Sequence, residues 1–191
     1  MQPFRLKHRT TDKGPETHDA PEQAAPKTHS RLRWLAHLLL ILAIFAVLHW
    51  WRSEPLASGD APPLTGDLIS TGRFDLGDLR GKPVLVHFWA TWCPVCRLGD
   101  DAIDAIAEDY DVVTVAMQSG GATEIVGHLR REGLSFPVIA DPYGEIASRW
   151  GVPGVPASFV LDGAGRIEFA TVGHTTELGL RGRLWAAGRS D

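Results

Sequence analysis

The only two cysteines of this 191-residue chain, Cys93 and Cys96, stand two residues apart in the segment Cys93-Pro94-Val95-Cys96. A disulfide across so short a loop removes little entropy from the unfolded chain, about 2 kcal/mol by the loop-length relation. With no other cysteine present, this disulfide cannot join distant parts of the fold. The pair can instead alternate between dithiol and disulfide: one thiolate attacks a disulfide in another molecule, and the second resolves the mixed disulfide. The spacing therefore predicts thiol–disulfide exchange.

The residues on either side of the pair predict a strand followed by a helix. Residues 84–89 (VLVHFW) form a β-rich run after a Gly-Lys-Pro turn, and residues 97–110 place apolar side chains four positions apart, as in an amphipathic helix. Cys93 is then expected to begin that helix, where free N–H groups and the helix dipole lower the pKa of its thiol. Cys96 would lie one turn further on, shielded from solvent, as the resolving cysteine. Pro94 suits the first helical turn because its missing N–H is not needed there.

The rest of the C-terminal part alternates between predicted strands and helices. A hairpin is predicted around the turn at residues 162–165, and a helix follows it. This order indicates an α/β sandwich. The further predicted strands are 112–117, 136–140, 158–161 and 167–172, and the further predicted helices are 122–132, 144–150 and 177–187.

An uncharged run of 18 residues, 34–51, precedes this domain and has tryptophans at both ends. As a helix it would span about 27 Å, close to the hydrocarbon thickness of a bilayer. Residues 1–33 carry seven Lys or Arg and four Asp or Glu, whereas Arg52 is the only basic residue until Arg73. The positive-inside rule then leaves the N-terminus in the cytoplasm and exports the residues C-terminal to the run. An uncleaved anchor is favoured over a cleaved signal peptide because the leader before the run is long.

The chain is thus divided into a disordered cytoplasmic tail (1–33), a transmembrane anchor (34–51), a linker (52–65) and a folded domain (66–191). The tail is rich in proline and charge, and the linker in Pro, Gly, Ser and Ala. The whole chain carries a net charge of −4 and the tail +3, so the remaining residues carry −7. This acidic balance gives no indication of a nucleic-acid partner.

Two segments in this order resemble the signatures of the thioredoxin superfamily, in its membrane-anchored bacterial (TlpA-like) branch. The first is VLVHFWATWCPVC (84–96), and the second is GVPGVPASFV (151–160). The segment GHTTELGLRGRLW (173–185) is similar to the protein disulfide oxidoreductases linked to suppression of copper sensitivity. The resemblance implies a thioredoxin fold, a central mixed sheet flanked by helices. It implies periplasmic exchange with protein thiols and disulfides, recycling by a membrane electron donor or acceptor, and no cofactor beyond the redox-active disulfide.

The resemblance also implies roles for residues outside the cysteine pair. Pro156 is the expected cis-proline, favoured over Pro153, and the backbone of Val155 would bind a substrate chain. Pro94 and Val95 would tune the reduction potential. The direction of electron flow stays open, with reduction slightly favoured.

Three residues near the pair are interpreted with alternatives. Trp92 is expected to shield the sulfurs and contact substrate, or else to pack in the core. His87 stands where thioredoxins carry a buried acid, so it could accept the proton of Cys96 or be a core histidine satisfied by backbone. Gly99 stands where haem-maturation relatives usually carry glutamate, which argues against a cytochrome c-specific reductase.

Two other kinds of function remain as alternatives. The cysteines could bind Cu(I), which prefers thiolates, although His87, His128 and His174 offer no clear third ligand. The domain could also be a non-catalytic interaction module, which would work normally after Cys93→Ser. A peroxidase is disfavoured because no Thr-x-x-Cys motif is present.

Overall fold

The computed structural model describes residues 34–44 and 56–189, which belong to two compact units. Residues 34–44 are helical. Within the described residues, no helix has both the length and the apolar character needed to cross a bilayer. The remainder of the predicted anchor and the predicted tail lie outside the described residues.

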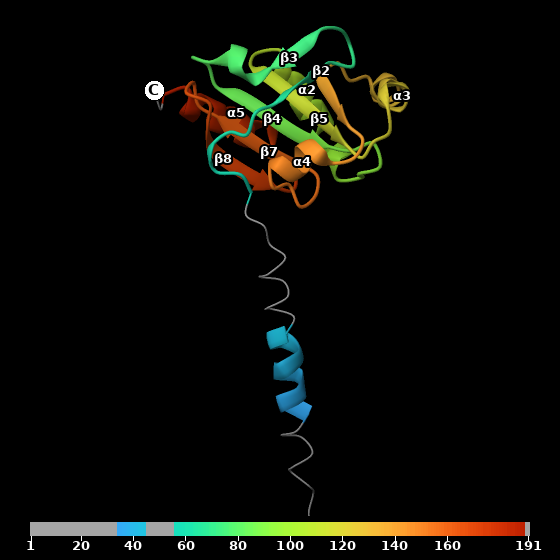
Figure 1. The fold of residues 1–191 in the computed structure, drawn as a ribbon, viewed down its shortest axis with the longest axis vertical. Helices are drawn as coiled ribbons and strands as arrows, with labels where there is room; N and C mark the ends of the chain where they lie inside the picture. The colour runs from blue at the N-terminus through green and yellow to red at the C-terminus, as the bar shows by residue number, and fades with distance from the viewer. Residues whose placement is uncertain (1–33, 45–55, 190–191) are drawn as a thin grey trace, which may run out of the picture. The chain divides into compact units, whose positions relative to one another are not determined.

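The C-terminal unit is built on a six-stranded mixed sheet with the order β1-β8-β7-β4-β5-β6. Figure 1 labels its strands β8, β7, β4 and β5. Strands β4, β5 and β6 are parallel, whereas β7 runs antiparallel to β4, and β8 antiparallel to β7. The predicted hairpin is therefore present. The strands are β1 (Gly59–Asp60), β4 (Val84–Trp89), β5 (Asp111–Met117), β6 (Val138–Asp141), β7 (Ala157–Leu161) and β8 (Arg166–Val172).

Helices cover both faces of this sheet, and the central strand β4 is therefore buried on both sides. Its Leu85 and Trp89 belong to one core cluster, together with residues of α2 (Asp100–Ala107), α3 (Ala122–Glu132) and α5 (Glu177–Ala187). Its alternate residues belong to a second cluster, shared with α4 (Glu145–Arg149). A small hairpin of β2 (Thr65–Asp67) and β3 (Arg73–Asp75) and a short 3-10 helix (Leu76–Leu79) complete the unit. This is the thioredoxin fold that the sequence predicts.

Two predicted boundaries are wrong. The linker was expected to extend to residue 65, but Gly59–Asp60 pairs with β8 and Leu64 is fully buried. Residues 56–65 therefore pack on the domain, since a few apolar side chains and an edge strand outweigh their Pro- and Gly-rich composition. The helix expected over 97–110 is also broken. A short 3-10 helix (Cys96–Leu98) comes first, and α2 begins only at Asp100.

Candidate active site

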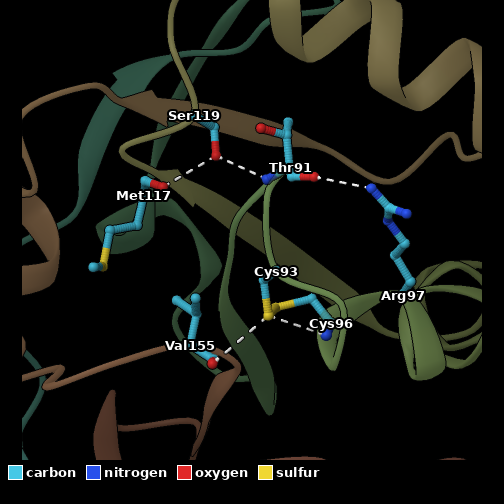
Figure 2. Close-up of a disulfide and its surroundings, with 7 residues drawn as sticks. All are labelled: Thr91, Cys93, Cys96, Arg97, Met117, Ser119 and Val155. Atoms are coloured by element: carbon cyan, nitrogen blue, oxygen red, sulfur yellow. Dashed lines mark hydrogen bonds between the residues drawn. A yellow bond between two sulfur atoms is a disulfide. The ribbon is translucent and has the colours of Figure 1, made fainter.

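The two cysteines are joined in a disulfide directly after the central strand β4 (Figure 2). Their Cα atoms are 5.4 Å apart. Cys93 is 3% exposed and Cys96 is 2% exposed, so both sulfurs are sheltered in the oxidised protein. The two cysteines are sheltered to nearly the same extent, so exposure does not decide which one is the nucleophile. The roles predicted for them rest on their different contacts.

Cys93 does not begin a regular helix, which corrects the predicted source of its thiolate stabilisation. The backbone at residues 94–95 turns, and the 3-10 helix starts at Cys96. The turn nevertheless aims one N–H at the sulfur, because the Cys96 backbone N–H donates to Cys93 Sγ at 3.1 Å. A hydrogen bond to the charged form of a thiol favours its ionisation. This N–H can therefore stabilise the Cys93 thiolate, the role that was expected of the helix dipole.

Val155 and Pro156 lie opposite the disulfide, as the sequence motif predicts. The Val155–Pro156 peptide bond is cis, the form expected for it. The Val155 carbonyl oxygen lies 3.7 Å from Cys93 Sγ (Figure 2). Pro156 is buried directly before β7, whereas Val155 is half-buried. Backbone groups at this position are thus within reach of whatever binds at Cys93.

The loop that carries the cysteines is held by residues that come after β5. Ser119 accepts the Thr91 backbone N–H at 3.0 Å and donates to the Met117 carbonyl oxygen at 3.0 Å (Figure 2). The Trp92 indole N–H donates to the Gln118 carbonyl oxygen at 3.0 Å, and Trp92 is still 56% exposed. Trp92 therefore does not pack as a core residue. Sequence reasoning missed Gln118 and Ser119, which are ordinary polar residues of a loop.

Pro94 and Val95 are exposed at the tip of the turn. Val95 also lines the small cavity beside Cys96. Their influence on the potential remains a prediction.

His87 lies beneath the active-site turn and is only 6% exposed. Its Nδ1 shares a hydrogen bond of 2.9 Å with Ser158 Oγ on the neighbouring strand β7. Burial lowers the pKa of His87 from 6.5 to about 4, so the ring is neutral near pH 7. The side chain lines a small cavity together with Cys96. His87 is therefore near the resolving cysteine, but its bond goes to a side-chain hydroxyl rather than to backbone.

His174 also lines that cavity, although sequence reasoning had set it aside as remote from the cysteines. The imidazole lies over Gly99, where an added Cβ would be 3.2 Å from His174 Nδ1. The other remote histidine, His128, is buried and stacks against Trp89 with ring centroids 5.3 Å apart. Across residues 34–44 and 56–189, no three His, Cys, Asp or Glu side chains are grouped so that they could hold a metal ion. The structure thus offers no third ligand there for the copper alternative.

Comparison with known proteins agrees with this geometry. Residues 57–179 match the model of the Redoxin family. A thioredoxin-like protein of Haemophilus influenzae is 34% identical over 155 residues, which cover 80% of this chain and 92% of that protein. A thiol:disulfide interchange protein DsbE homolog of Paracoccus denitrificans is 35% identical over 139 residues, covering 66% of this chain and 77% of the relative.

Solved structures give the same result for the fold. The crystal structure of a secreted disulfide oxidoreductase of Mycobacterium tuberculosis superposes with a TM-score of 0.55 and 26% identity. The match covers 64% of this chain and 95% of that one. The folded unit carries the cysteine pair and, facing it, the Val155–Pro156 segment. On these matches, the chain belongs to the redoxin family of the thioredoxin superfamily.

Proposed function

We propose that this protein catalyses thiol–disulfide exchange with protein substrates through Cys93 and Cys96. The observation that carries the proposal is the position of the disulfide between an N–H that can stabilise a thiolate and the backbone of Val155. Relatives named thiol:disulfide interchange proteins support the same reaction. No cofactor enters this reaction, because the disulfide itself carries the two electrons.

In the reducing direction, the Cys93 thiolate attacks one sulfur of a substrate disulfide. The substrate S–S bond breaks, a mixed disulfide forms, and the released substrate sulfur takes up a proton. Cys96 then loses its proton and attacks Cys93 Sγ. The mixed disulfide breaks, the Cys93–Cys96 disulfide forms, and the second substrate sulfur leaves as a thiolate. The substrate gains two electrons, which the enzyme loses.

Substrate recognition is proposed to use the exposed surface around Cys93. Trp92 offers an exposed aromatic ring before Cys93, and Val95, two residues after Cys93, is 43% exposed. An extended substrate segment would bind along the backbone at Val155, as an added strand does. Such main-chain recognition tolerates many sequences, which suits an enzyme that acts on protein substrates.

We further propose that the domain is held in the bacterial periplasm by an anchor at residues 34–51, with residues 1–33 in the cytoplasm. The uncharged run and the asymmetry of basic residues around it support this topology. In that compartment the protein acts as a reductase, and a membrane electron donor returns Cys93 and Cys96 to the dithiol. The donor is needed because each turnover leaves the enzyme oxidised.

A glutathione redox titration of residues 53–191, followed by thiol alkylation, tests this proposal. We expect a reversible two-electron couple below about −200 mV, which fits a reductase supplied with electrons. A potential near about −120 mV would make the protein a dithiol oxidase that needs a membrane re-oxidant. The absence of a reversible couple would refute the exchange function.

A further inference from the structure

A cavity of about 10 Å³ lies beside Cys96, between the active-site turn and the segment that leads into α5. This volume accommodates about one water molecule. The titratable side chains that line the cavity are Cys96, His87 and His174, and Ser158 and Thr175 contribute hydroxyl groups. The cavity therefore joins the resolving cysteine to two imidazoles, of which His174 is distant from it in the sequence.

The two imidazoles differ in their access to solvent. His87 is 6% exposed and lies on the buried strand β4, whereas His174 is exposed at the surface. The glycine at position 99 allows this arrangement, since a Cβ there would be 3.2 Å from His174 Nδ1. Cys96 itself is 2% exposed. His174 is thus the lining imidazole through which the cavity can exchange protons with the surrounding water.

The loop that carries His174 is fixed at both of its ends. The Gly173 backbone N–H donates to the Pro156 carbonyl oxygen at 2.8 Å, which holds this loop to the segment facing Cys93. Thr176 caps α5, and its hydroxyl oxygen accepts the Gly179 backbone N–H at 3.2 Å. The imidazole is therefore presented at the cavity by a backbone with a defined position.

Cys96 must lose a proton before it can attack, because the thiolate is the nucleophile. His87 is a poor acceptor for that proton, since burial lowers its pKa to about 4. Its Nδ1 is also engaged with Ser158 Oγ. The proton thus needs another destination, and histidine is the side chain that commonly exchanges protons near neutral pH.

Building on the proposed exchange function, we propose that His174 receives the proton of Cys96 through one water in this cavity. As Cys96 Sγ attacks Cys93 Sγ, its proton passes to the water, and a proton of that water passes to His174. The mixed disulfide breaks, and the substrate sulfur leaves with the electron pair. His174 then releases the proton to solvent. In the oxidising direction the same path returns a proton to the Cys96 thiolate when it leaves.

The test separates the attack of Cys93 from the attack of Cys96. The reduced full-length chain, purified in detergent, is mixed with a chromogenic aromatic disulfide in a stopped-flow instrument. The first thiolate released reports attack by Cys93, and the second reports resolution by Cys96. We expect His174→Ala to slow the second phase by about 10- to 100-fold, which is at or below the lower end of the range for general acid–base catalysis. The first phase should change less than twofold.

Three further measurements distinguish proton transfer from a merely structural role. In His174→Ala, added imidazole should accelerate the second phase, and the rate should otherwise rise in proportion to hydroxide concentration between pH 6 and 8. The matched control Leu178→Ala alters an exposed side chain of the same segment that does not line the cavity, and it should show neither effect. Gly99→Ala should slow the second phase by displacing the imidazole, while leaving His174 in the chain.

A second phase in His174→Ala within twofold of wild type, with the same pH dependence, would overturn the role of His174 and leave the exchange function intact. If His174→Ala slows the second phase and added imidazole does not restore the rate, the role of His174 would also be overturned, because the loss would then be structural. If the wild-type protein released no thiolate at all, the exchange function itself would fail.

Discussion

The buried His87 should make the folded domain sensitive to mild acid. Its pKa falls from 6.5 in the unfolded chain to about 4 in the fold because burial penalises the charged ring. The folded state therefore binds fewer protons than the unfolded state between these values. The stability that the neutral ring contributes is present above about pH 6.5 and is lost as the pH falls toward 4. His87→Asn should remove this loss while leaving a polar group near Ser158 Oγ.

The magnitude is set by the two pKa values. Between pH 7 and pH 5, His87 alone should lower the free energy of unfolding by about 2 kcal/mol. The complete shift would amount to about 3 kcal/mol at lower pH. Urea unfolding of oxidised residues 53–191 measures this, with tryptophan fluorescence as the signal, since Trp89 and Trp150 are fully buried in the fold. The oxidised form is used so that no thiol titrates.

Comparing wild type with the variant cancels the other titrating groups. Asp100 works in the opposite direction, because burial, with the charges of Glu132 and Asp101, raises its pKa to about 6. The fold consequently gains stability from Asp100 as the pH falls from 7 to 5. This gain is common to wild type and His87→Asn, so the difference between their pH dependences reports His87. If wild type and variant lose stability in parallel to within about 0.5 kcal/mol, burial does not hold His87 neutral in the fold, and the prediction is refuted.

The remaining predictions concern the chemistry, the substrate surface and the stability of the fold. Cys96→Ala should accumulate mixed disulfides with substrate proteins on non-reducing gels, and Cys93→Ala few; equal amounts would contradict the assigned roles. Trp92→Ala should raise KM for a protein substrate about fivefold, with Trp92→Phe as the control, because the ring is 56% exposed; an unchanged KM would argue against substrate contact. Asp104→Ala should lower the free energy of unfolding by about 1–3 kcal/mol, since Asp104 Oδ1 accepts two backbone N–H groups at 2.7 and 2.8 Å. Urea midpoints test this last prediction, and a shift no larger than that of an exposed control such as Glu108→Ala would contradict it.

Most of the fold could be predicted because its elements are encoded by local patterns. The apolar run at 84–89 and the turn at 162–165 predict β4 and the hairpin of β7 and β8, which the structure contains. The errors arise where tertiary contacts outweigh composition. Residues 56–65 look like a linker, yet Leu64 is fully buried and β1 pairs with β8. No local pattern shows that a sheet edge will be available to a segment about a hundred residues earlier.

The site shows the same limit in a sharper form. Cys93, Cys96 and Pro156 could be found because each belongs to a motif that can be read from neighbouring residues. His174 belongs to a motif as well, but its relation to Cys96 depends on three separate segments. Gly99 follows the 3-10 helix after β4, and Pro156 directly precedes β7. The Pro156 carbonyl oxygen accepts the Gly173 backbone N–H at 2.8 Å. Gly99 therefore matters because it leaves room for the His174 imidazole, and this relation can be identified only in the folded chain.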